Sequence, residues 1–84
     1  MTYTYATSGT CSRQIDFELD GSTIKSVVFT GGCHGNLQGI SKLVEGMNAE
    51  EAIKRLRGIC CGSKTTSCPD QLAIALEAAL QKQQ

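Results

Sequence analysis

Residues 12–30 read SRQIDFELDGSTIKSVVFT, and this stretch decides the fold. Over 12–19 apolar and polar residues alternate, which is typical of a strand with one buried face, here Ile15, Phe17 and Leu19. Asp20-Gly21 favours a tight hairpin turn with positive φ. Residues 23–30 are rich in β-branched side chains, which favour a returning strand. Because Tyr3 and Tyr5 alternate with threonines before this hairpin, the sequence predicts three antiparallel strands.

After residue 32 the hydrophobic period changes to three and four, which predicts helices. The first helix is expected to end at Gly46 and to bury Leu37, Ile40, Leu43, Val44 and Met47. Asn48, with Glu51 three residues later, predicts a second helix whose apolar face holds Ala52, Ile53, Leu56 and Ile59. After a loop over 58–67, Pro69 is expected to begin a last helix capped by Cys68 and burying Leu72, Leu76, Ala79 and Leu80. We therefore predict an α+β fold of order βββααα, with a three-stranded antiparallel sheet packed on three helices.

Length and charge narrow the class of protein. The 84 residues fit one domain, and 40% apolar content favours a small folded unit over a disordered chain. Eight basic and eight acidic residues cancel, which argues against nucleic acid as the main partner. No run of about 18 apolar residues suggests a membrane span, and the first residues do not resemble a signal peptide. These features predict a cytoplasmic protein.

Five cysteines in so short a chain point to thiol or metal chemistry. A disulfide scaffold does not suit a reducing compartment, which leaves metal ligands, redox thiols or buried structural thiols. Cys33 lies between a predicted strand and a predicted helix, and Cys68 lies at a second helix start, where free N–H groups lower the pKa of a thiol. His34 could be a ligand, a base or a surface residue.

Other groups allow more than one interpretation. Cys60 and Cys61 could form a strained, easily reduced disulfide, or one thiol could face inward and one outward. Asp70 is most simply a favourable charge in a first helical turn, with a ligand or supporting role as the alternative. The glycine loop over 31–36 also resembles a weak phosphate cradle, although it lacks the spacing of known nucleotide-binding loops.

The segments TSCPD at 66–70, GCHGN at 32–36 and QLA at 71–73 resemble the pattern of the TSCPD domain family. The resemblance covers most of the chain, roughly from Tyr3 to Leu80. The family includes small stand-alone proteins and the C-terminal part of vitamin B12-dependent (class II) ribonucleotide reductases. The resemblance implies a single TSCPD-like domain over residues 1–84, associated with ribonucleoside-diphosphate reductase. The chain is too short to hold the catalytic barrel and radical cysteines of that enzyme.

A second resemblance is to iron–sulfur scaffold proteins of the IscU and N-terminal NifU type. Those proteins also run strands then helices, and Cys11, Cys33 and Cys68 fall where they carry cluster-binding cysteines. Arg13 replaces an aspartate of the scaffolds and Ser67 replaces a histidine. The resemblance therefore implies a shared fold and a pocket of three thiolates. Because of these two differences it does not imply cluster assembly.

Together these observations predict a non-catalytic module that binds zinc or an iron–sulfur cluster. The expected ligands are Cys11, Cys33 and Cys68, completed by His34, Cys60 or Cys61, with the three sulfurs within about 8 Å of one another. The alternatives are a thiol redox partner that passes electrons to a reductase and a regulatory or nucleotide-binding accessory domain. The sequence predicts neither the metal nor the oligomeric state.

Overall fold

The computed structural model describes residues 1–10, 12–32 and 34–82. Over these ranges the chain forms the strands β1 (Thr2–Ala6), β2 (Ser12–Asp20) and β3 (Thr23–Gly31), followed by the helices α1 (His34–Val44), α2 (Ala49–Leu56) and α3 (Cys68–Lys82). The predicted α+β class and the order βββααα are confirmed.

The strands form one antiparallel sheet in the order β1-β2-β3, so β2 is central. The Asp20-Gly21 turn is confirmed, because Asp20 pairs with Thr23 and Gly21 has a φ of 61°. A left-handed residue at the first central position gives the hairpin its right-handed twist, and glycine adopts that conformation without steric cost. At the other, open end of this hairpin Ser12 pairs with Gly31.

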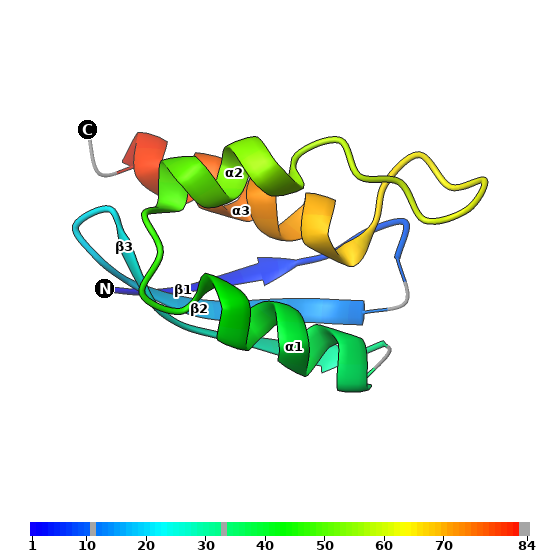
Figure 1. The fold of residues 1–84 in the computed structure, drawn as a ribbon, viewed down its shortest axis with the longest axis horizontal. Coiled ribbons are helices and arrows are strands. Elements are labelled where there is room, and N and C mark those ends of the chain that lie inside the picture. Colours follow the sequence, from blue (N-terminus) through cyan, green and yellow to red (C-terminus); the bar gives the residue numbers. More distant parts are fainter. Residues whose placement is uncertain (11, 33, 83–84) are drawn as a thin grey trace.

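The core lies between one face of the sheet and the helices (Figure 1). The predicted inward residues of β2, Ile15, Phe17 and Leu19, are at most 2% exposed. They meet Leu72 and Leu76 of α3, which are fully buried. α1 packs on β3, and α2 packs on α3. On the opposite face Thr4 and Gln14 donate hydrogen bonds to Asp16, and these bonds hold the pKa of Asp16 below its ordinary value.

Two residues assigned to the core by helical spacing are exposed instead. The side chain of Leu43 on α1 is 76% exposed, and Ile59 is 43% exposed because α2 ends at Leu56. A period of three and four identifies the apolar side of a helix, but it does not show how far across that side the neighbouring elements reach. Both residues instead border the groove described below.

The second helix begins as the sequence predicts. Asn48 is its N-cap, and the Asn48 side chain accepts hydrogen bonds from the backbone N–H groups of Glu50 and Glu51. Just before it, Ile24 of β3 donates its N–H to the carbonyl of Met47 and accepts from the N–H of Gly46. The start of β3 is therefore paired on its outer side with the segment that leads into α2.

Candidate functional site

Cys68 lies at the open end of the β2–β3 hairpin. It is the first residue of α3, is 7% exposed, and its Sγ donates a hydrogen bond of 3.1 Å to Oγ of Ser12. Since Ser12 pairs with Gly31, Cys68 is placed at the predicted end of the sheet, far from the Asp20 turn. Cys11 and Cys33 lie outside the described residues, so convergence of the three sulfurs remains a prediction.

The residue that contacts Cys68 is held firmly by its neighbours. The carbonyl of Ser12 accepts hydrogen bonds from the hydroxyl groups of Thr7, at 2.6 Å, and Thr10, at 3.2 Å. The Thr10 and Ser12 hydroxyl groups also lie 3.1 Å apart. Ser12 is 3% exposed, so the Cys68 thiol packs against a fixed polar group at the end of the sheet.

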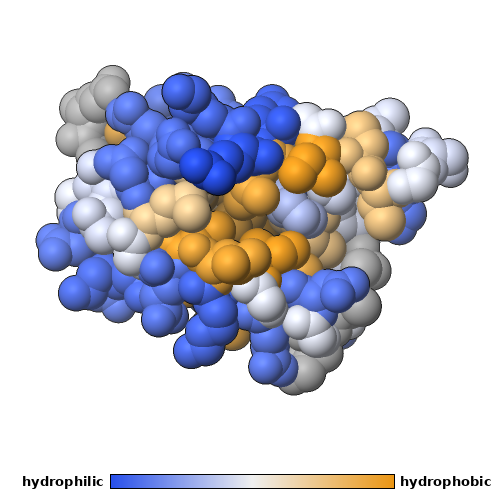
Figure 2. Space-filling view, in the orientation of Figure 1, coloured by the Kyte–Doolittle hydropathy of each residue, from blue (hydrophilic) through white to orange (hydrophobic). Residues whose placement is uncertain are grey.

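An apolar groove of about 540 Å³ opens beside Cys68. One side is α1, with Leu37, Ile40 and Leu43, and the other is the loop that leads into α3. Figure 2 shows apolar side chains gathered between α1 and the region where α2 passes into this loop. The remaining lining residues are Thr10, Gly35, Asn36, Gly39, Ile59, Cys60, Cys61, Lys64, Ser67, Cys68 and Pro69.

Three of the predicted thiols therefore line one groove. Cys60 and Cys61 are exposed and carry free thiols, so the vicinal disulfide is not formed. The Sγ of Cys60 lies 3.6 Å from the carbonyl oxygen of Gly58. His34 opens α1, and its side chain is outside what the structure describes. Among the side chains that the structure describes, which do not include that of His34, no three histidine, cysteine or acidic groups gather closely enough to hold a metal ion.

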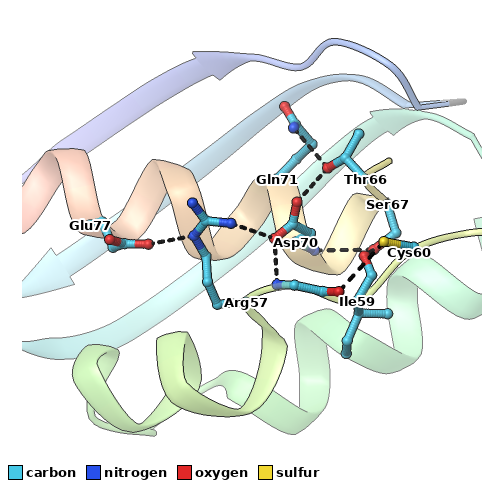
Figure 3. Close-up of polar contacts among 9 residues, drawn as sticks. Arg57, Ile59, Cys60, Thr66, Ser67, Asp70, Gln71 and Glu77 are labelled. Atoms are coloured by element: carbon cyan, nitrogen blue, oxygen red, sulfur yellow. Dashed lines mark hydrogen bonds and ion pairs between the residues drawn. The ribbon is translucent and has the colours of Figure 1, made fainter. Parts of the chain in front are cut away.

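Asp70 ties the loop to α3 (Figure 3). One carboxylate oxygen, Oδ1, accepts from the Arg57 guanidinium at 3.1 Å and from the Gly58 N–H at 2.7 Å. The other, Oδ2, accepts from the Thr66 hydroxyl at 2.5 Å. The Thr66 hydroxyl holds the pKa of Asp70 below its ordinary value, with Gly58 and Arg57 adding to the effect and burial opposing it.

Gln71, the residue that follows the TSCPD segment, extends this network. Gln71 donates its side-chain amide to the Thr66 hydroxyl at 3.0 Å, and its oxygen accepts from the N–H of Ser8, which precedes β2. On the other side of Asp70, Arg57 also donates to Glu77 at 2.8 Å. The motif thus joins the end of α2, the loop, α3 and the β1–β2 connection at one place.

Ser67, and not Cys68, caps α3. Its Oγ accepts from the N–H of Asp70 at 3.2 Å and donates to the carbonyl of Ile59 at 2.6 Å. The prediction that Pro69 begins the helix was wrong by one residue, because α3 starts at Cys68. The signal was present in the sequence: Ser67 followed by Asp70 at the third position is a capping pattern. Since Ser67 takes this role, the Cys68 side chain points to Ser12.

The arrangement positions exposed and buried thiols differently. Cys61 is fixed through its backbone N–H, which donates to the Thr66 carbonyl at 3.2 Å, while its side chain stays exposed on the groove rim. Cys68 is fixed through its side chain inside the fold. Thiols on the loop and at the start of α3 therefore line one apolar groove.

The sequence model of the TSCPD domain matches residues 1–80. No curated protein and no solved structure matches the chain. Among the described residues no helix has the length and apolar character needed to cross a membrane.

Proposed function

Because the chain belongs to the TSCPD domain family, we propose that it is a thiolate module that binds zinc or an iron–sulfur centre at the open end of the hairpin. The proposed ligands are Cys11, Cys33 and Cys68, and His34, Cys60 or Cys61 completes the set. The protein works in the cytoplasm, where thiols stay reduced.

One observation carries this proposal: Cys60, Cys61 and Cys68 line a single groove at the end of the sheet where residues 10 and 12 flank Cys11. Ser12 contacts Cys68 and pairs with Gly31, two residues before Cys33. Ser12 and Gly31, which are close in sequence to Cys11 and Cys33, are thus at the same end of the molecule as Cys68. The proposal requires rotamer changes that bring the thiols together, because no three of the described donor side chains gather closely enough to hold a metal ion.

The donor chemistry fits zinc or an iron–sulfur cluster better than a hard cation. Zinc and iron–sulfur centres take thiolate ligands, whereas magnesium and calcium take oxygen ligands. The buried carboxylate nearest Cys68 in sequence is Asp70, and both of its oxygens already accept hydrogen bonds from Arg57, Gly58 and Thr66. We therefore expect Asp70 to support the loop and the thiolates to supply the ligands.

Metal analysis of protein purified under nitrogen tests the proposal. We expect about one equivalent of zinc or a bound cluster per chain, and a loss of at least about tenfold in Cys68→Ser, because a tetrahedral site does not close without one of its thiolates. Leu43→Ala is the matched control, since it changes the same groove without removing a donor. Comparing Cys60→Ser with Cys61→Ser identifies which of the two contributes. Less than a tenth of an equivalent of any metal in the unaltered protein contradicts the proposal.

A second candidate function is a thiol redox partner of a ribonucleoside-diphosphate reductase. It is favoured by the adjacent, exposed Cys60 and Cys61, which a partner can reach directly. The two thiols would form a disulfide, giving two electrons and two protons to a disulfide of the reductase, which becomes two thiols. Thiol titration separates the candidates: a metal site releases its thiols when chelator is added, and a redox pair releases them when reductant is added.

A further inference from the structure

We propose that the outer edge of β3 is a self-association surface, on which β3 of a second copy of this chain pairs antiparallel about a two-fold axis. The two sheets would then join into one continuous sheet. This inference does not depend on the thiol site, because the paired segment contains no cysteine.

The hydrogen-bonding pattern shows which groups of β3 point outward. Met1 and Leu19 exchange both backbone hydrogen bonds, and Thr7 donates to the carbonyl of Arg13, so the odd-numbered residues of β2 bond to β1. In an antiparallel sheet hydrogen-bonded pairs alternate. The even-numbered residues of β2 therefore bond to β3, where their partners are Ser26, Val28 and Thr30. The N–H and C=O groups of Val27 and Phe29 consequently point away from the sheet.

The outer edge of β3 is occupied only at its start among the described residues. Ile24 bonds there to Gly46 and Met47, and the register shift that leaves Lys25 as an extra residue separates it from the rest of the strand. Residues 26–31 read SVVFTG, without a charge or a proline. Natural proteins normally protect a free strand edge with charged residues or proline. Because residues 26–31 have neither, we expect this edge to be covered by another strand.

A hollow of about 340 Å³ runs along this edge between β3 and α1. Its strand side holds residues 26–29 and Gly31, and its helix side includes Gln38, Ser41, Lys42 and Glu45. A strand added to β3 would lie beside this hollow. Because Lys42 and Glu45 carry opposite charges, the helix side of the hollow has no net charge that would repel a second copy.

The exposed side chain of Val28 favours pairing with a second copy of the chain in a register centred on Val28. Val28 is 59% exposed on the open face of the sheet, where its partner across β2 is Asp16. If the axis passes through Val28, Val27 exchanges hydrogen bonds with Phe29 of the second copy, and the two Val28 side chains meet in a close non-hydrogen-bonded pair. Ser26 then faces Thr30, and Lys25 faces Gly31, so no like charges are opposed. The same patch serves both copies, as two-fold association requires.

Amide hydrogen exchange on the unaltered protein tests the paired edge. Raising the protein concentration from about 10 µM to about 1 mM should slow exchange at Val27 and Phe29 several-fold, up to the limit of about tenfold that mass action sets for a monomer–dimer equilibrium, because association protects these two outward amides. The amides of Ser26 and Val28, already bonded to β2, serve as internal controls and should change little. Fast exchange of Val27 and Phe29 at both concentrations overturns the proposal.

A charge-swap experiment tests the register. Val28→Lys and Val28→Glu should each be monomeric by light scattering at a concentration where the unaltered protein is a dimer, because each places like charges face to face. An equimolar mixture should restore the dimer through a Lys–Glu pair. Thr4→Lys, on the same open face but on β1, is the control and should leave the dimer intact. Association by either variant alone, or its absence from the mixture, contradicts an axis through Val28.

Discussion

Asp70→Asn is expected to lower the free energy of unfolding at pH 7 by about 2–4 kcal/mol. The substitution keeps the shape of the side chain but removes the charge that receives hydrogen bonds from Arg57, Gly58 and Thr66. It also puts an N–H₂ group where one of these donors points. Since the Asp70 side chain is only 5% exposed, water cannot replace the lost bonds at low cost.

The same variant should change how stability depends on pH. The folded pKa of Asp70 lies below its ordinary value of 3.8, so the folded state binds this proton less readily than the unfolded state. The stabilisation is therefore complete above about pH 4 and is lost as pH falls through the folded pKa. The difference in free energy of unfolding between the unaltered protein and Asp70→Asn should therefore become smaller in acid. Both proteins should still lose some stability in acid, because the pKa of Asp16 also lies below its ordinary value.

Urea unfolding followed by circular dichroism at pH 7 and at about pH 3 measures both effects. Glu77→Gln is the matched control: it removes the other acidic partner of Arg57, but that pair is exposed and should contribute less than about 1 kcal/mol. A loss at pH 7 no larger for Asp70→Asn than for Glu77→Gln would show that Asp70 does not anchor the loop.

Leu76→Ala is expected to lower the free energy of unfolding by about 2–5 kcal/mol. Leu76 is fully buried between α3 and the sheet, and removing its isobutyl group leaves a cavity in a small core. A domain of this size has about 4–13 kcal/mol of stability in total, so the loss is a large fraction of it. The midpoint of thermal unfolding should fall by at least about 10 °C.

Leu43→Ala tests whether this effect comes from burial. It is the same chemical change on another helix, but Leu43 is 76% exposed. The free energy of unfolding should therefore change by less than about 0.5 kcal/mol. Calorimetry on the two variants compares them directly. Equal losses would mean that the exposed face of α1 is covered in solution, since only then would Leu43 be buried.

Local patterns in the sequence predicted the sheet and the helix order well. Alternation over β2, glycine in the left-handed turn and Asn48 at a helix start each depend on neighbours in sequence, and each is confirmed. Leu43 and Ile59 show the limit of this reasoning. Their exposure depends on which elements lie across from them, and that is a property of the tertiary arrangement.

The same limit explains the candidate site. Gln71 contacts Ser8, 63 residues away in sequence, and Arg57 contacts Asp70 across the loop. No local pattern identifies such partners, so Asp70 was interpreted as a helix-start charge when it is the centre of a network. The TSCPD segment was rightly singled out. Most of its polar residues stabilise the loop, and Cys68 is the member that faces the end of the sheet.

The hydrogen bonds at the base of the cysteine loop also determine how much the loop can vary in length. The Ser67 hydroxyl donates to the carbonyl of Ile59, and the N–H of Cys61 donates to the carbonyl of Thr66. These two bonds close the loop before its tip at residues 62–65. Those tip residues are all exposed. Doubling the length of a flexible tip costs only about 0.6 kcal/mol of closure entropy. Insertions between Lys64 and Thr65 can therefore change the shape of the groove rim while Cys60 and Cys61 keep their positions.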